Sequence, residues 1–190
     1  MKKFVLAFSA LLLLAGCGES TQTTKRYVRQ FKEPGSDFSK RVGDFHTRLV
    51  IAGTNSDITA SDRSMLTDSS GTLGPPYRLY IVGNDYGRTG GKFTILETIM
   101  KIGDQDPITL ISSQGPPVRI PFGKWLDHAD SATHEIDLTD ILPFQVGQEV
   151  IVTAKMLMPE TGEEVSIKTV FKGVEKATKN SKLETMLQGS

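Results

Sequence analysis

The chain has 190 residues, in which 22 lysine and arginine residues balance 22 aspartate and glutamate residues, and it contains a single cysteine. A net charge of zero argues against a partner chosen by bulk electrostatics, such as nucleic acid or an anionic membrane surface. One cysteine excludes an internal disulfide, and the length is that of one domain with a tail.

Residues 1–17 have the order of a secretory signal: a positive end, an apolar middle and a cleavage site of small residues. Their sequence is MKKFVLAFSALLLLAGC. The alternative is a transmembrane helix that is never removed, but residues 4–17 would span only about 21 Å against a hydrocarbon core of about 30 Å. The stretch is therefore predicted to be a cleaved signal peptide.

The last four residues of this stretch, Leu14-Ala15-Gly16-Cys17, resemble the lipobox of bacterial lipoproteins. The resemblance implies that signal peptidase II recognises Leu14, Ala15 and Gly16 and cleaves before Cys17, whose sulfur carries a diacylglyceryl group. It also implies acylation of the new amino terminus, with palmitate expected among the chains. Because each buried methylene contributes about 0.8 kcal/mol, two or three chains hold a protein on a membrane without a spanning segment.

Cleavage would leave 174 of the 190 residues, with a net charge of −2 because Lys2 and Lys3 are lost. We expect a signal peptide (1–16), a lipidated cysteine and tether (17–39), a folded domain (40–173) and a tail (174–190) that frays or forms a short helix. A basic cluster in the tether could contact lipid headgroups, although a solvated linker is the simpler interpretation. It comprises Lys25, Arg26, Arg29 and Lys32 beside Tyr27 and Phe31.

From residue 48 onward, short apolar and β-branched runs alternate with glycine, proline, asparagine and aspartate, which is typical of strands and turns. Pro121 marks an edge or a bulge within one run. The last two runs alternate with period two around a turn that contains Gly162, and this predicts a β-hairpin. Strands are expected at 49–52, 77–82, 92–102, 108–112, 118–126, 134–142, 150–158 and 165–171, with a long loop at 54–76.

About eight short strands, with neither a central helix nor a disulfide, predict an all-β fold in the form of an antiparallel β-sandwich. Residues 138–154, with LTDILP, Gly147 and VIVTA, resemble the passage from strand E to strand F in fibronectin type III domains. That family belongs to the immunoglobulin-like sandwiches. The tyrosine usual near the start of strand F is missing, because no tyrosine occurs between Pro143 and Ala154.

Two groups of residues invite a ligand-binding interpretation. The glycine-rich stretch 83–92 fails the phosphate-loop pattern, because Tyr86 stands where a glycine is needed and Phe93 where a hydroxyl is needed. His128 and His134 are six residues apart, which fits neither helical zinc spacing nor a zinc finger. Histidines on the surface or in caps are the simpler interpretation. Further ligands for such a site would be Asp127, Asp130, Glu135 and His46.

Acidic and aromatic residues offer no clearer site. The acids of the long loop are spaced wrongly for an EF-hand, no Gly-x-Ser-x-Gly motif occurs, and acids on strands usually face water rather than forming a glycosidase pair. A lone tryptophan beside strand residues is more often part of the core. The loop acids are Asp57, Asp62 and Asp68, the acids considered as a glycosidase pair are Asp137 and Asp140, and the tryptophan is Trp125.

We therefore predict a lipid-anchored lipoprotein of the bacterial cell envelope that acts as a non-catalytic binding or structural assembly module. The alternative is an envelope hydrolase or metal-dependent enzyme with a site built from loops such as 54–76 and 127–134. The expected partners are the membrane, through the lipid on Cys17, and an envelope protein, but not nucleic acid. We expect no catalytic residue, no metal and no cofactor besides this covalent lipid.

The residue after Cys17 bears on location. Gly18 is no retention signal for the inner membrane, so the family resemblance favours the outer membrane, facing the periplasm, in a Gram-negative organism. In a bacterium with a single membrane, the same anchor would place the domain outside the cell.

Overall fold

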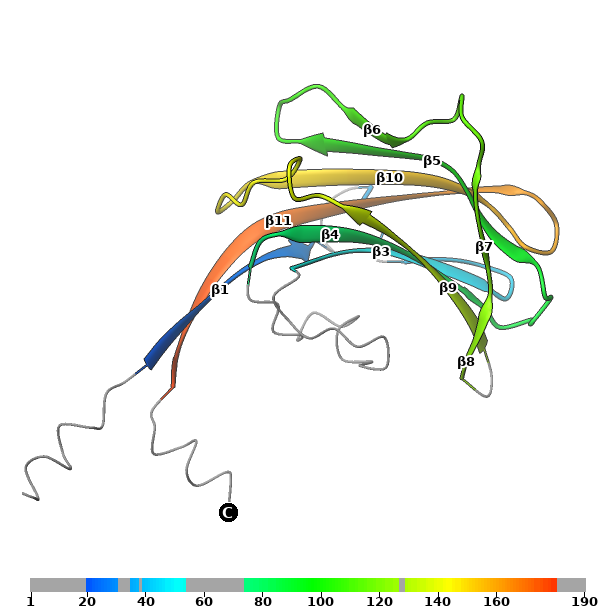
Figure 1. The fold of residues 1–190 in the computed structure, drawn as a ribbon, viewed down its shortest axis with the longest axis horizontal. Coiled ribbons are helices and arrows are strands. Elements are labelled where there is room, and N and C mark those ends of the chain that lie inside the picture. The colour runs from blue at the N-terminus through cyan, green and yellow to red at the C-terminus, as the bar shows by residue number, and fades with distance from the viewer. Residues whose placement is uncertain (1–19, 31–34, 38, 54–73, 127–128, 181–190) are drawn as a thin grey trace, which may run out of the picture. The chain divides into compact units, whose positions relative to one another are not determined.

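A computed structural model of the chain describes residues 20–30, 35–37, 39–53, 74–126 and 129–180 (Figure 1). Throughout these ranges the secondary structure is β, without a helix, which confirms the all-β prediction. The strands are β1 (Ser20–Arg29), β2 (Lys40–Val42), β3 (Phe45–Gly53), β4 (Tyr77–Asp85), β5 (Lys92–Ile102), β6 (Ile108–Ile111), β7 (Val118–Pro121), β8 (Gly123–Leu126), β9 (Ala129–Asp137), β10 (Glu149–Leu157) and β11 (Glu164–Asn180).

The strands form two sheets, which appear in Figure 1 as two layers. Sheet A has the order β1-β11-β10-β5-β6, with β7 also paired to β5, and sheet B has the order β2-β3-β4-β9-β8. The chain changes sheets four times, between β1 and β2, β4 and β5, β7 and β8, and β9 and β10. The predicted antiparallel sandwich is confirmed.

The strand order is that of an immunoglobulin-like sandwich, in which one sheet contains strands A, B, E and D and the other contains C, F and G. In sheet B, β3, β4, β9 and β8 take the positions of A, B, E and D. In sheet A, β5, β10 and β11 take the positions of C, F and G, while β1 and β2 extend one edge of each sheet. Residues 138–148 thus connect strands E and F, as the sequence of this passage predicts.

The core lies between the sheets and is filled by alternate residues of each strand. The hairpin predicted from 150–171 is confirmed, because β10 and β11 pair antiparallel from Glu149–Lys172 to Leu157–Glu164. Its period-two pattern places one face of both strands in the core, where removal of apolar surface from water stabilises the fold. Fully buried core residues include Leu49, Tyr77, Leu79, Ile81, Phe93, Met100, Val150, Val152, Ala154 and Met156.

Pro121 stands where the chain passes from one sheet to the other. The run 118–126 divides into β7, which pairs with β5 in sheet A, and β8, which pairs with β9 in sheet B. Proline has no N–H to donate to a ladder, so it suits the last residue of an edge strand. The interruption expected at Pro121 is therefore a change of sheet.

The domain boundaries differ from those expected. Residues 20–29, assigned to the tether from the sequence, form β1, and residues 174–180, assigned to the tail, continue β11 as a strand and not as a helix. One compact unit spans 25–174 and holds the sandwich; the other comprises 1–24 and 175–190. In the described part of this second unit, the Thr24 hydroxyl donates to the Lys176 carbonyl oxygen at 3.1 Å.

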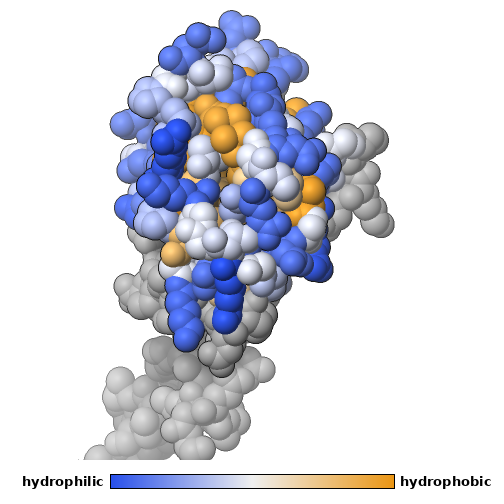
Figure 2. All heavy atoms as spheres, turned by 90° about the vertical axis from the view of Figure 1, so that its right-hand side faces the viewer, coloured by the Kyte–Doolittle hydropathy of each residue, from blue (hydrophilic) through white to orange (hydrophobic). Residues whose placement is uncertain are grey.

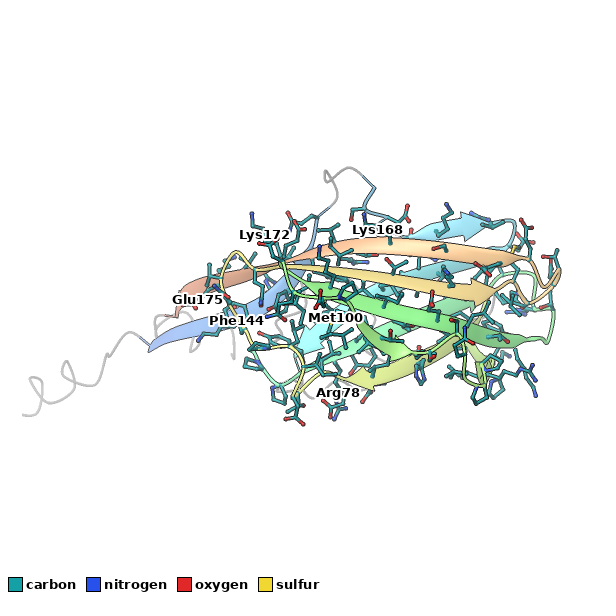
Figure 3. The ribbon with its side chains drawn as sticks, turned by 90° about the horizontal axis from the view of Figure 1, so that it is seen from above. Arg78, Met100, Phe144, Lys168, Lys172 and Glu175 are labelled. Carbon is teal, nitrogen blue, oxygen red and sulfur yellow. The ribbon has the colours of Figure 1, made fainter. Side chains whose placement is uncertain are left out.

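Tyr27 of β1 holds the passage between strands E and F. Its hydroxyl lies 3.0 Å from the carbonyl oxygen of Pro143 and also contacts the side-chain amide of Gln148. Its ring meets Tyr77 edge-on at 5.1 Å and Phe144 at 5.9 Å between centroids. Phe144, labelled in Figure 3, belongs to the β9–β10 connection. A tyrosine from the first strand therefore holds the connection that lacks a tyrosine of its own.

Candidate functional site

The candidate site lies on the outer face of sheet B, where β2, β3 and β4 run side by side. In β3, burial alternates from Phe45 to Val50: Phe45, Thr47 and Leu49 are buried in the core. The intervening His46 and Arg48 therefore lie on the opposite, outer face. Polar residues are usual on the solvated face of an antiparallel sheet, so the neighbours of this pair decide whether it forms a site.

Strand register assembles these side chains with others from both neighbouring strands. Arg41 of β2 is paired with His46, and His46 is paired with Asn84 of β4. Paired residues share a face of the sheet, so these three form one row across three strands. Arg48 lies two residues further along β3. Tyr86 follows the end of β4, and the guanidinium of Arg41 lies 5.8 Å from the centroid of its ring.

Three buried polar atoms of this group have no hydrogen-bond partner in the described part of the chain: Nδ1 of His46, Nε of Arg48 and Oδ1 of Asn84. The Asn84 side chain is the most enclosed of the three, since the residue is only 2% exposed. An unsatisfied buried polar group typically costs about 1–3 kcal/mol. Three such atoms in adjacent positions point to a ligand that would satisfy them.

The electrostatic environment of the row is positive. Burial, together with the charges of Arg48 and Arg41, lowers the pKa of His46. Burial and the charge of Arg29 lower the pKa of Arg48, and only a smaller effect of Tyr86 opposes them. Cationic groups that lower the pKa of one another indicate positive charge without matching negative charge.

Carboxylates compensate little of this charge. Asp44 approaches Arg41 at 3.8 Å, but both side chains are exposed, so this pair is weak. Within the described ranges no carboxylate forms an ion pair with Arg48 or His46. We call Arg41, His46, Arg48, Asn84 and Tyr86 the sheet B cluster. It could bind an anion, or a polar ligand that supplies hydrogen bonds to its three unpartnered atoms.

Figure 2 faces the end of the sandwich that carries the β2–β3 turn, the β4–β5 connection and the β10–β11 turn. Hydrophilic side chains make up most of this end and surround smaller apolar patches.

Two depressions lie on the surface of the described residues. One, of about 300 Å³, is lined by Lys92, Thr94, Arg119 and residues 157–159 and 162. Another, of about 640 Å³, is lined by residues 102–105 and 145–149. Neither brings together a nucleophile and a base.

The histidines considered from the sequence do not converge in sheet B. His46 is paired with Asn84, whereas His134 of β9 is paired with Ile81, whose side chain is fully buried in the core. The two histidines therefore lie on opposite faces. Burial lowers the pKa of His134. His128 and Asp127 lie outside the described residues, and among the residues that are described no group of three or more His, Cys, Asp or Glu could hold a metal ion.

The acids considered from the sequence have structural roles where the structure describes them. Asp137 accepts hydrogen bonds from the backbone N–H and the hydroxyl of Thr139, at 2.8 and 2.5 Å. These bonds lower the pKa of Asp137. Glu135 forms an ion pair with Arg78 at 2.7 Å. The loop acids Asp57, Asp62 and Asp68 fall in 54–73, outside the described ranges, and Trp125 is placed on β8 by its backbone alone.

The basic cluster considered near residue 25, for which a solvated linker is the simpler interpretation, is described at Lys25, Arg26 and Arg29. The Lys25 ammonium lies 5.8 Å from the centroid of the Phe144 ring. Arg29 is only 5% exposed, and Lys32 lies outside the described residues. These positions do not form one exposed patch.

Sequence reasoning missed the sheet B cluster. It named His46 only as an additional metal ligand and began the strand at Leu49, whereas β3 begins at Phe45. A period-two pattern already begins at Phe45, because Phe45, Thr47 and Leu49 alternate with His46 and Arg48. This pattern could have moved the predicted start of the strand from Leu49 to Phe45. No sequence signal could have placed Asn84 opposite His46, because that depends on the register of two strands 38 residues apart.

Comparison with known protein families matches residues 1–17 to the prokaryotic membrane lipoprotein lipid attachment site. The match supports a bacterial lipoprotein, anchored in the cell envelope through lipid. Its folded part is the β-sandwich described above. No curated protein and no solved structure matches the chain. In the described part of the structure, no helix is long and apolar enough to cross a membrane.

Proposed function

We propose that this lipoprotein is a non-catalytic binding module, held at the envelope by lipid on Cys17 and binding its ligand through the sheet B cluster. The observation that carries the proposal is the set of three buried, unpartnered polar atoms on His46, Arg48 and Asn84. The strands that carry them are paired, so the backbone geometry is set before a ligand arrives, and side-chain movement is needed to expose the buried atoms.

Cleavage by signal peptidase II after Leu14, Ala15 and Gly16, and acylation that includes palmitate, complete the proposed anchor. These residues lie outside the described part of the structure, so the proposal rests on their sequence. Because Gly18 follows the cysteine, we place the module at the outer membrane, facing the periplasm, in a Gram-negative organism.

The proposal is tested by photo-crosslinking in cells. A photoreactive residue replaces Val50, which lies in β3 beyond Arg48, or, as the matched control, Ser166 on the outer face of sheet A. We expect one specific adduct from position 50, none from position 166, and loss of the adduct when Arg48→Ala is added. Equal labelling from both positions, or an adduct that is insensitive to Arg48, would contradict binding at the sheet B cluster.

A further inference from the structure

We propose that the sheet B cluster binds an oxyanion, a phosphate or carboxylate group, between Arg41, Arg48 and the side-chain amide of Asn84. The inference rests on the proposed function and names the chemistry of the ligand.

Charge is the first argument. Arg41, His46 and Arg48 bring up to three positive charges to one outer face, and among the described residues the carboxylate that pairs with them, that of Asp44, makes only an exposed 3.8 Å pair with Arg41. Such a face repels a cation and attracts an anion. Arginine presents a planar fork of N–H donors that matches carboxylate and phosphate oxygens, and these charge-assisted hydrogen bonds are the strong ones.

The unsatisfied hydrogen-bonding groups are the second argument. Nε of Arg48 is a donor, and at His46 the ring nitrogen Nδ1 lacks a partner among the residues described. Asn84 Oδ1 is an acceptor, but rotation of the amide by half a turn exchanges it for the NH₂ group, which donates two hydrogen bonds. With that rotation, and with the proton of the His46 ring on Nδ1, all three side chains present donors, which is the set that an oxyanion requires.

The neighbouring arginine on the same face differs from Arg48 in its charge partner, although the Nε of both arginines has no hydrogen-bond partner among the described residues. Arg78 of β4 alternates with the buried residues Tyr77 and Leu79 and so lies on the outer face of sheet B, and its guanidinium pairs with Glu135 of β9 at 2.7 Å. Arg78 thus has its carboxylate within the fold. Arg48, on the same sheet, has none in the described part of the chain, so an external oxyanion would take the equivalent place.

Oxyanions of this kind come either from a soluble ligand or from a phospholipid headgroup, and the experiment separates these sources. The full-length lipidated protein, with isotope-labelled arginine and histidine, is placed in phosphatidylcholine nanodiscs. Inorganic phosphate is titrated at constant ionic strength while the NMR signals of Arg48 Nε–H and the His46 ring are followed. A second sample, in nanodiscs of equal phosphatidylcholine and phosphatidylglycerol, is measured without added phosphate.

We expect saturable shifts of both signals with phosphate, and binding at least about tenfold weaker in Arg48→Ala, the equivalent of one charge-assisted hydrogen bond. Arg78→Ala removes the same charge from the same sheet face and should leave the affinity unchanged. Lys172→Ala, on the outer face of sheet A (Figure 3), should behave likewise. Matching shifts in the phosphatidylglycerol sample would identify a headgroup as a source of the oxyanion, whereas their absence there would assign the site to soluble ligands.

Shifts that do not saturate, or that are equal in Arg48→Ala and Arg78→Ala, would overturn the oxyanion site. Arg48→Lys keeps the charge but loses the fork, so it replaces Arg48→Ala if that variant fails to fold, and it should bind more weakly than the wild type. A specific adduct from position 50 without phosphate binding would leave the binding module standing and reject the oxyanion. Phosphate binding without an adduct would keep the oxyanion site and reject a macromolecular ligand at the cluster.

Discussion

The hydroxyl of Tyr27 lies 3.0 Å from the carbonyl oxygen of Pro143, which is 116 residues away along the chain. This contact joins the strand nearest the lipid anchor in sequence to the connection between the two sheets. The same connection is held from β11, because the Gly147 N–H donates to the Gly173 carbonyl and the Gly173 N–H donates to the Gln148 carbonyl. Residues 25–29 of β1 thus belong to the unit that holds the sandwich and not to a tether.

Replacing Tyr27 by phenylalanine should lower the free energy of unfolding by about 1 kcal/mol, because the ring contacts persist and only the hydroxyl is lost. Tyr27→Ala should lower it by about 3 kcal/mol or more, since it also leaves a cavity. Urea unfolding monitored by circular dichroism measures both. Tyr80→Phe, on the outer face of sheet B, is the control: its hydroxyl bonds to the side chains of Arg78 and Glu135, where water can take its place, so the change in stability should be less than about 0.5 kcal/mol. Equal effects at positions 27 and 80 would show that the contact with Pro143 contributes nothing.

Stability should fall as the pH rises through the range in which buried tyrosines titrate. Burial raises the pKa of Tyr27 to about 12, and burial, together with Tyr27, raises the pKa of Tyr77 still further. The unfolded chain loses these protons near pH 10 while the folded chain keeps them, so the unfolded state gains stability between about pH 10 and pH 12. Below this window the contribution is complete.

Urea titrations at several alkaline pH values measure this dependence. In Tyr27→Phe the slope should be shallower, because one of the two groups no longer titrates. A slope identical to that of the wild type would show that Tyr27 does not contribute.

Gly83→Ala should destabilise the sandwich by about 1–3 kcal/mol through overpacking. A Cβ at position 83 would stand 2.8 Å from the Phe93 ring, which is itself fully buried and has no space to retreat. Gly115→Ala is the control, since a Cβ there would meet only the Ser112 carbonyl oxygen at 3.5 Å. Thermal unfolding of both variants measures the difference, and a neutral Gly83→Ala would mean that β4 and β5 can separate without loss.

Binding of sulfate at the sheet B cluster should strengthen as the pH falls below about 6.5, the ordinary pKa of histidine. Burial, Arg48 and Arg41 hold the pKa of His46 below this value in the free protein. A bound anion would favour the protonated ring and raise its pKa, so by linkage protonation favours the anion. The groups facing His46 are Arg41 and Arg48, with Asn84 opposite it.

Sulfate is the suitable probe because it does not itself titrate in this range. Isothermal titration at several pH values measures the affinity, and the pH dependence should disappear in His46→Gln. In the absence of anion, the lowered pKa means that the stability contributed by His46 is complete above about pH 6.5 and is lost as the pH falls below it. An affinity that does not change with pH would remove His46 from the site.

Growth with a labelled fatty acid should mark the wild-type protein, and Cys17→Ser should abolish the label because the lipid is expected on the cysteine sulfur. Ser64→Ala, within the loop 54–76, provides a control that leaves the lipobox intact. A labelled Cys17→Ser protein would contradict attachment at this residue.

Several features of the fold follow directly from local patterns. The hairpin of β10 and β11 was predictable because both strands are long, alternate with period two and are joined by a short turn. The strand break at Pro121 was predictable because proline has no N–H to pair. β1 was not, because residues 20–29 are polar at their start and show no clear period, and their partner β11 lies at the far end of the chain.

The sequence by itself determined the anchor signature of residues 1–17 and the all-β character of the domain, because a cleavage signal and a strand period are each written in neighbouring residues. Only the tertiary structure decided that Tyr27 closes the connection at Pro143 and that His46, Asn84 and Arg41 lie in one row. Those relationships depend on the register between strands distant in sequence, and register is set by the packing of the whole core rather than by local propensity.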